Sequence, residues 1–327
     1  MCFNKSIKSS LKKLSAVLLF AAIFSVAFAK VKVSKGPEFY FMVEYQEESA
    51  PGDIIYLTVT VGKLSDGTLI LPGDPHIKLI RNSTGKSPGE TDLYLVNDSL
   101  GVLFGAIPLS TWLEKGEFTL VYTYKDTIGT SHEENYPIVV NPKEFINEDI
   151  PLNATNTAIR TDTSSTKVAQ IDRLNEVLFK VNPESNYYDG LFIQPVDTTR
   201  RTSFFGDRRT YVYNTGTKSV SEHYGIDFGV PTGTPVKACG SGKVVLAENR
   251  ISTGWSIVIE HLPGLYSLYY HMDSLISSEG DIVKQGEIIG KSGATGLATG
   301  PHLHWEIRLN GTAVNPDYFK ENLLFRP

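Results

Sequence analysis

Residues 302–310 read HLHWEIRLN, and this stretch decides the fold of the C-terminal part of the chain. Apolar and polar residues alternate along it: Leu303, Trp305, Ile307 and Leu309 against His302, His304, Glu306 and Arg308. This period of two is typical of a β-strand with one buried face. The preceding glycine-rich stretch GKSGATGLATGP predicts a turn. Both histidines are therefore expected on the polar face of a strand, at the mouth of a site.

The surrounding sequence predicts that residues 191–327 form an antiparallel, mostly-β domain. Short strand patterns separated by glycine turns follow one another, among them GKVVLAE, WSIVIEH and YSLYYHM. A helical pattern appears only at Pro316–Leu323. Cys239 lies within a strand-like stretch and is interpreted as a small core residue.

A second motif, HYGIDFGVPTGTPV, begins at His223 and contains Asp227. Its glycines and prolines exclude a helix, but a turn at Tyr224-Gly225 that leads into a strand can present both side chains to one ion. Two histidines and one carboxylate, with water in the fourth position, form an open catalytic zinc site. A structural zinc site is usually closed by cysteines, and calcium or magnesium prefers oxygen ligands.

A third motif, YSLYYHMDS, supplies a candidate for proton transfer. Alternation along it predicts that His271 leaves an apolar strand on its polar face. A zinc-bound water still needs a group that takes or guides its proton, and the chain has no His-Glu-x-x-His helix to provide a glutamate. His271 and His302 are the candidates for this role. His261, at the end of WSIVIEH, is expected to be a strand-edge residue.

Together these motifs resemble the lysostaphin/LytM-type zinc endopeptidases, which cut peptidoglycan cross-bridges or stem peptides. The resemblance covers about residues 194–320 and includes the stretch SFFGDRR at 203–209. It implies that His223, Asp227 and His304 are zinc ligands, and that His271 and His302 are the two catalytic histidines. Glu306 and Arg208 are interpreted as structural salt-bridge partners, although either could orient a ligand or the substrate.

The first 29 residues have the three parts of a secretory signal peptide. Four lysines precede an apolar run from Leu14 to Ala29, which ends in Ala-Phe-Ala. An uncleaved anchor is the alternative, but the run is short for a membrane span. Removal of these residues leaves 27 basic and 36 acidic residues, a net charge of −9. Such a charge repels phosphate backbones and argues against nucleic acid as a partner.

Residues 30–150 are predicted to form an Ig-like β-sandwich, because about seven short strand patterns are separated by turn residues. The candidates are 39–45, 53–61, 76–81, 92–96, 102–108, 116–124 and 136–140. Residues 151–190 are predicted to be a linker. Within it, a polar run at 153–166 has little to bury and precedes a connector helix at Lys167–Val181, with Ser164, Ser165 and Thr166 as possible N-caps.

The function expected from the sequence is that of an exported zinc metalloendopeptidase of the periplasm or cell envelope. Zinc-bound water would attack an amide of a peptidoglycan stem or cross-bridge peptide, with His271 and His302 as acid/base and oxyanion stabilisers. The sandwich is expected to dock on envelope proteins, with a covering role over the active site as the alternative. A non-catalytic relative that activates a cell-wall amidase is the alternative function, and the five intact site residues argue against it.

Overall fold

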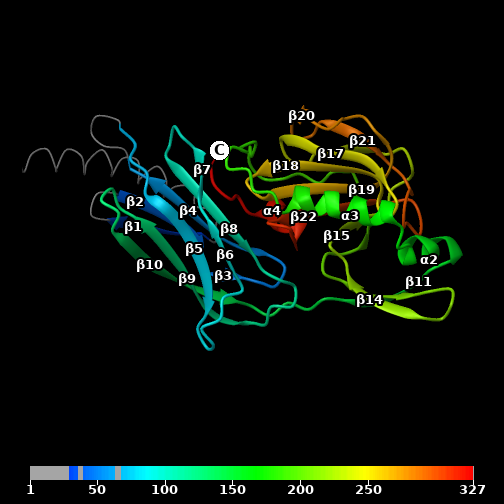
Figure 1. Ribbon diagram of the computed structural model, residues 1–327, viewed down its shortest axis with the longest axis horizontal. Helices are drawn as coiled ribbons and strands as arrows, with labels where there is room; N and C mark the ends of the chain where they lie inside the picture. The colour runs from blue at the N-terminus through cyan, green and yellow to red at the C-terminus, as the bar shows by residue number, and fades with distance from the viewer. Residues whose placement is uncertain (1–28, 36–39, 63–67, 327) are drawn as a thin grey trace, which may run out of the picture. The chain divides into compact units, whose positions relative to one another are not determined.

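The computed structural model describes residues 29–35, 40–62 and 68–326. The predicted signal peptide therefore lies outside the described residues, apart from Ala29. None of the helices among the described residues is both long enough and apolar enough to cross a membrane. The chain forms two compact units (Figure 1). In the described part, one contains residues 29–48, 56–105 and 117–139, and the other contains residues 49–55, 106–116 and 140–326.

The N-terminal region is built from two five-stranded sheets, which confirms the predicted β-sandwich. One sheet has the order β1 (Ala29–Lys35), β2 (Tyr40–Gln46), β4 (Ile54–Val61), β8 (Val102–Pro108), β7 (Tyr94–Asn97). The other has the order β3 (Glu48–Ser49), β10 (Ser131–Val140), β9 (Gly116–Lys125), β5 (Gly73–Arg81), β6 (Gly89–Asp92). Phe41 of β2 packs edge-on against Tyr122 of β9, with ring centroids 6.4 Å apart. Such aromatic contacts join the two inner faces of the sandwich.

The C-terminal region is built on a large antiparallel sheet, as the alternation predicted. Its main path is β12 (Arg201–Ser203), β15 (Gly225–Phe228), β22 (Leu303–Leu309), β19 (Leu265–Leu275), β18 (Gly254–Leu262), β17 (Gly242–Arg250), β20 (Ile282–Val283). Three further strands join it, β16 (Pro235–Lys237), β21 (Ile288–Ser292) and β23 (Thr312–Val314). Leu303, Trp305 and Ile307 are fully buried, and so is Cys239, as predicted.

A small third sheet departs from the purely antiparallel prediction. It contains β11 (Asn147–Pro151), β13 (Arg208–Val212) and β14 (Lys218–Glu222), in that order. β13 and β14 are antiparallel, but β11 pairs with β13 in parallel. The chain can enter β13 from β11 in the same direction because two helices and a long connection lie between them.

Two helices occupy the predicted linker, where one was expected. The polar run was expected to have little to bury, but it contains α2 (Ala154–Thr161), in which Asn156 and Thr157 are buried. The side chain of Asn153 caps α2 by accepting a hydrogen bond from the Asn156 N–H. α3 (Ser165–Leu178) begins after its N-cap Ser164 and ends three residues before the predicted end. A last helix, α4 (Pro316–Glu321), matches its prediction closely.

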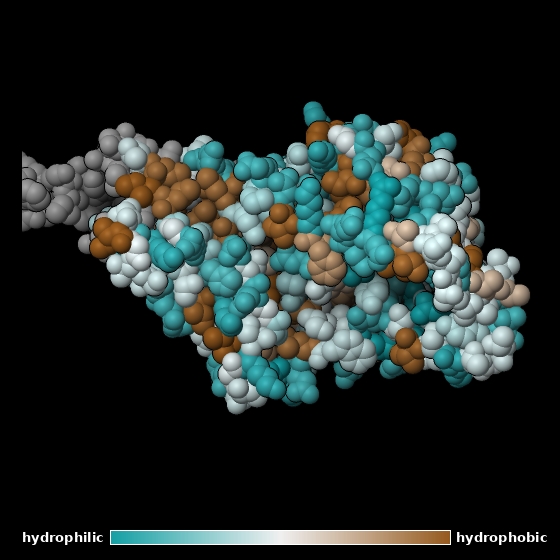
Figure 2. All heavy atoms as spheres, viewed as in Figure 1, coloured by the Kyte–Doolittle hydropathy of each residue, from teal (hydrophilic) through white to brown (hydrophobic). Residues whose placement is uncertain are grey.

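Helix α3 packs on the sheet through its apolar side, as expected of a connector helix. Leu178 joins a buried cluster on the strands, which consists of Leu246, Val258, Tyr266, Leu268 and Tyr270. Figure 2 shows exposed hydrophobic residues on one face as brown groups among hydrophilic neighbours. Only the C-terminal end of α3 thus joins the core, through Leu178 with the partly buried Leu174 and Val177, whereas Val168 and Ile171 are exposed.

Candidate metal and catalytic site

Two neighbouring strands carry the predicted ligands Asp227 and His304. β15 and β22 are antiparallel, and Asp227 lies directly opposite His304 in their register. Directly opposite residues of such a pair point to the same face of the sheet. The carboxylate and the imidazole therefore meet there, and both are buried, with exposures of 6% and 8%.

His223 reaches the same point from the chain just before β15. Its backbone N–H donates to the Asp207 carbonyl, and its own carbonyl accepts from the Gly206 N–H, both at 2.8 Å. Gly225 allows the close approach of β15 to β22, because a Cβ there would lie only 2.3 Å from the Trp305 carbonyl oxygen. The turn predicted at Tyr224-Gly225 thus presents His223 and Asp227 to one centre.

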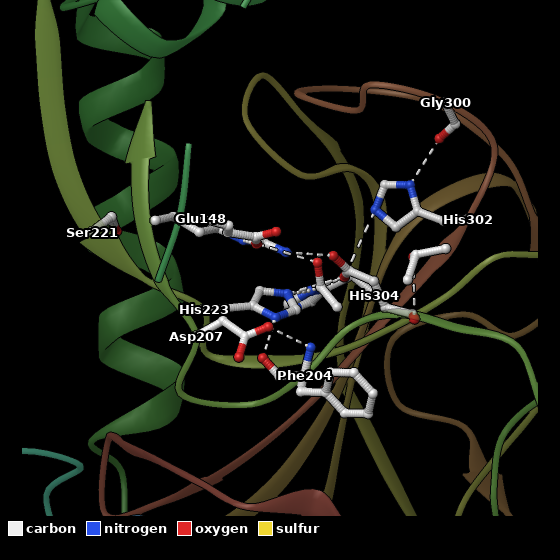
Figure 3. Close-up of polar contacts among 12 residues, drawn as sticks. Glu148, Phe204, Asp207, Ser221, His223, Gly300, His302 and His304 are labelled. Carbon is white, nitrogen blue, oxygen red and sulfur yellow. Dashed lines mark hydrogen bonds and ion pairs between the residues drawn. The ribbon is translucent and has the colours of Figure 1, made fainter. Parts of the chain in front are cut away.

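The three ligand atoms have nearly the spacing expected around a single ion. His223 Nε2 lies 3.1 Å from Asp227 Oδ1 and 3.0 Å from His304 Nδ1. His304 Nδ1 lies 2.8 Å from Asp227 Oδ1. Ligand atoms at about 2.0–2.1 Å from a tetrahedral zinc ion are about 3.3 Å apart. Figure 3 shows His223 and His304 converging on this centre.

Each ligand is held in place by a second contact at its other polar atom. His223 Nδ1 donates to the Phe204 carbonyl (2.8 Å), His304 Nε2 donates to Glu306 (3.4 Å), and Asp227 Oδ2 accepts from Arg209 (2.9 Å). These contacts leave a lone pair on each inward-facing nitrogen and negative charge on Asp227 Oδ1. With both imidazoles neutral, three acceptors face one another, an arrangement that suits a bound cation.

The electrostatics of the cluster also favour a positive charge at its centre. Burial raises the pKa of Asp227, but His223 and His304 outweigh burial and hold that pKa well below its ordinary value. Burial lowers the pKa of His304, but Asp227 and Glu306 together raise it to about 9. Burial lowers the pKa of His223. The cluster is therefore built to hold a cation, and a metal ion can take the place of a proton.

His302 lies beside this cluster, at the end of the glycine-rich loop. Its Nδ1 donates to the Gly300 carbonyl at 2.8 Å, so the other nitrogen, Nε2, faces inward (Figure 3). That nitrogen is 3.8 Å from Asp227 Oδ1. His302 is thus adjacent to the three ligand atoms without joining them, as expected for a catalytic residue.

His271 reaches the site by a route that its sequence pattern did not predict. Tyr270 lies opposite His304 in the β19–β22 register, and their rings stack with centroids 5.4 Å apart. Regular alternation would therefore turn His271 to the other face of the sheet. Instead its φ is +59°, in the left-handed region, and the strand register shifts next to it. The prediction that regular alternation turns His271 toward the site was therefore wrong. This local irregularity of the strand turns the imidazole back toward the site.

The position of His271 suits a neutral base. Its Nδ1 donates to the Thr295 carbonyl at 2.8 Å, and its ring centroid lies 4.7 Å from that of His302. Burial, together with His302 and His304, lowers the pKa of His271 to about 3. The imidazole is therefore neutral at physiological pH, with Nε2 free to accept a proton.

The roles expected of three further residues are partly revised. Arg208 is structural, as expected, and bonds Glu222 at 2.7 Å. Glu306 was expected to be a salt-bridge partner, and it does pair with Arg308, but it also accepts from His304. Alternation along β22 already placed Glu306 on the face of His304 and could have indicated this. His261 is not at a sheet edge: it is fully buried in the interior strand β18.

Sequence reasoning missed two residues near the ligands, Arg209 and Glu148. Arg209 bonds Asp227, and Glu148 of β11 bonds Arg209 at 2.8 Å. Nothing in the sequence around Glu148 signals this contact, because β11 and β13 are 61 positions apart at this pair.

Residues 221–316 match the family model described as peptidase family M23. All five predicted site residues lie within this stretch, on the strands and loops described above. Residues 221–316 therefore form an M23 peptidase domain, which confirms the resemblance to lysostaphin/LytM-type endopeptidases.

Curated relatives share this domain. The chain is 40% identical over 127 residues to the DD-carboxypeptidase/endopeptidase Mpg of Neisseria meningitidis serogroup B, covering 39% of this chain and 28% of Mpg. It is 37% identical over 153 residues to the peptidoglycan DD-endopeptidase ShyA of Vibrio cholerae serotype O1, covering 44% of this chain and 35% of ShyA. The chain thus spans only about a third of the length of these two relatives.

One solved structure is similar over most of the chain. The crystal structure of an M23-type protein from Pseudomonas aeruginosa aligns with 83% of this chain and 94% of its own, with a TM-score of 0.53 and 24% sequence identity. At that identity the similarity shows a common fold and nothing more.

Proposed function

We propose that this protein is an exported zinc-dependent endopeptidase that hydrolyses amide bonds in the stem or cross-bridge peptides of peptidoglycan. The observation that carries the proposal is the convergence of His223 Nε2, Asp227 Oδ1 and His304 Nδ1, each with a second contact behind it. His271 and His302 stand beside these atoms. The names of the relatives Mpg and ShyA support the substrate class.

The donor set supports zinc as the metal. Two imidazole nitrogens and one carboxylate oxygen suit zinc and leave a fourth position for water or substrate, whereas calcium and magnesium prefer oxygen. When bound there, zinc would acidify the attacking water and polarise the scissile carbonyl.

The two remaining histidines would divide the proton transfer and charge stabilisation between them. His271 is neutral, and its Nδ1–H is engaged by Thr295, so Nε2 can accept a proton from the attacking water. His302 presents Nε2 to the same space, where in its protonated form it can donate to the oxygen of the tetrahedral intermediate. Their backbone anchors hold both rings in place before the substrate arrives.

Export and docking complete the proposal. Peptidoglycan lies outside the cytoplasmic membrane, and the basic and apolar N-terminal stretch supports export to the periplasm or cell envelope. Docking of the sandwich on envelope proteins remains a prediction. The acidic chain supports the expectation that nucleic acid is not a partner.

Digestion of purified peptidoglycan tests the proposal. We expect the zinc-loaded protein to release peptide fragments that mass spectrometry identifies as products of amide cleavage. A chelator should stop the release, and added zinc should restore it. Protein that binds no zinc and releases nothing, yet stimulates a cell-wall amidase, would establish the alternative function instead.

A further inference from the structure

One side chain outside the ligand set touches the ligand carboxylate directly. Arg209 of β13 donates from a terminal guanidinium nitrogen to Asp227 Oδ2 at 2.9 Å. The other carboxylate oxygen, Oδ1, faces His223 and His304. The final torsion of an aspartate side chain is broad and nearly two-fold. The contact with Arg209 therefore fixes the plane of the carboxylate, so that one of its oxygens faces the metal position.

Arg209 is itself held by the linker strand. β11 pairs with β13 in parallel, and in this register Glu148 lies beside Arg209. The Nε of Arg209 donates to Glu148 Oε1 at 2.8 Å. The side chains of Arg209 and Asp227 are only 11% and 9% exposed, so their contact is shielded from water, whereas Glu148 is 32% exposed. Shielded, charge-assisted hydrogen bonds of this kind are stronger than neutral or exposed ones.

The charge of Glu148 matters as much as its position. A guanidinium beside a divalent cation is unfavourable by itself, and it also draws electron density from the carboxylate that both share. The guanidinium of Arg209 is always charged, so its positive charge must be offset. Glu148 offsets that charge through its bond to Nε of the same guanidinium.

We infer that β11 supports the metal centre. Glu148 holds Arg209, and Arg209 is a positioning residue that orients the Asp227 carboxylate for metal binding. This inference rests on the proposed metal site and extends it into the linker. The catalytic unit then includes residues 147–151 as well as the peptidase domain.

Zinc affinity of the full-length protein tests the inference. Residues behind metal ligands typically change metal affinity by about 10- to 100-fold. We expect Glu148→Gln to weaken zinc binding by about 10-fold and Arg209→Met by up to about 100-fold, as measured by competition with a chromophoric chelator. Arg209→Lys should fall between Arg209→Met and the parent, because one ammonium cannot hold both carboxylates in the geometry of the guanidinium.

A matched control lies next to Glu148 on the same strand. Asp149 pairs instead with the exposed Lys218, at 3.5 Å, so Asp149→Asn should leave zinc affinity unchanged. The visible absorption of the cobalt-loaded protein gives a second readout, because its bands report ligand geometry. Glu148→Gln and Arg209→Met should shift these bands, and Asp149→Asn should not.

The outcomes separate this inference from the proposed function. If the parent protein binds no zinc, the proposed metal site itself fails. If the parent binds zinc, and Glu148→Gln and Arg209→Met bind it as tightly and give the same cobalt spectrum, β11 has no part in the metal centre. Thermal unfolding of the metal-free variants shows whether each one is folded.

Discussion

At the scale of single residues, the four histidines of the site differ in how closely their inward-facing nitrogens approach Asp227. His304 donates to the carboxylate of Glu306, whereas His223, His271 and His302 donate to backbone carbonyls. The inward-facing nitrogens of His223 and His304 lie within 3.1 Å of Asp227 Oδ1. The other two face the same space without joining the ligand set. The distance to Asp227, and not the partner of the outer nitrogen, therefore distinguishes the proposed ligands from the proposed catalytic histidines.

Removal of either catalytic histidine should lower the rate without removing the metal. We expect His271→Ala and His302→Ala each to reduce kcat by about 10²–10⁴, the usual contribution of a positioned acid or base. Zinc content should stay at the parental level, whereas His223→Ala should lose it. Rates of peptide release and zinc analysis of the same preparations check this prediction. Loss of zinc in His302→Ala would instead show that His302 is a metal ligand.

His261 should make stability depend on pH even though it lies outside the site. Its Nδ1 donates to the Ser241 carbonyl at 2.8 Å, and its Nε2 is 2.7 Å from Ser267 Oγ. Burial lowers its pKa to about 4, despite the opposing hydrogen bond. In the unfolded chain the pKa of this histidine is about 6.5, so at lower pH the unfolded chain binds a proton that the native protein does not. The free energy of unfolding therefore decreases as the pH falls below about 6.5.

The size of this effect is measurable. Between pH 7.5 and pH 5 the His261 contribution should lower the free energy of unfolding by about 2 kcal/mol. Urea unfolding of the parent and of His261→Gln at both pH values tests this, because other titrating groups cancel in the comparison. An equal loss in both proteins would show that His261 is not responsible.

At the scale of elements, the register of β15 against β22 builds the metal centre. Asp227 and His304 meet because they are directly opposed, and Gly225 opposite Glu306 permits the close approach of the two strands. A side chain at position 225 would contact the Trp305 carbonyl and the His304 ring, the latter at 2.9 Å. The absence of a Cβ at this position is thus a requirement of the site.

Gly225→Ala should weaken both metal binding and stability. The added methyl group must push β15 away from β22, which separates Asp227 from His304. We expect a loss of about 1–3 kcal/mol in stability, the usual cost of overpacking, together with weaker zinc binding. Gly300→Ala is the control, because a Cβ there meets nothing within 4 Å. Comparable zinc affinities for the two variants would contradict this reading of Gly225.

At the scale of the whole molecule, the C-terminal unit is larger than the family match. The match covers residues 221–316, but the core also contains Leu178 of α3, and β11 supplies Glu148. Residues before 191 therefore contribute to both the core and the site. The domain limits at residues 150 and 190 stay predictions.

Fragments of the chain can test the contribution of this linker region. A fragment of residues 191–327 lacks α3, which exposes the apolar cluster around Tyr266 and Leu268, and it also lacks Glu148. We expect it to unfold at a lower temperature and to bind zinc more weakly than a fragment of residues 140–327. Calorimetry and chelator competition measure both effects. Equal melting temperatures would show that α3 adds no stability.

The sequence alone determined the mostly-β fold, the sandwich, the connector helix and the five residues proposed for the site. These depend on local patterns: alternation along HLHWEIRLN, glycine and proline turns, and residue types with the chemistry of zinc ligands. Side-chain periodicity is set by neighbours within a few positions, so it can be read from the chain. The same property explains the failure at His271, where a single positive φ interrupts the period.

Only the tertiary structure decided how the site is supported. The parallel pairing of β11 with β13, the contact of Glu148 with Arg209 and the contact of Arg209 with Asp227 join residues 61 and 18 positions apart. Contacts over such separations depend on which strands pair and in which register, and no local pattern records that choice. The proposed metal ligands could therefore be predicted from the sequence, whereas the residues that hold them could be found only in the fold.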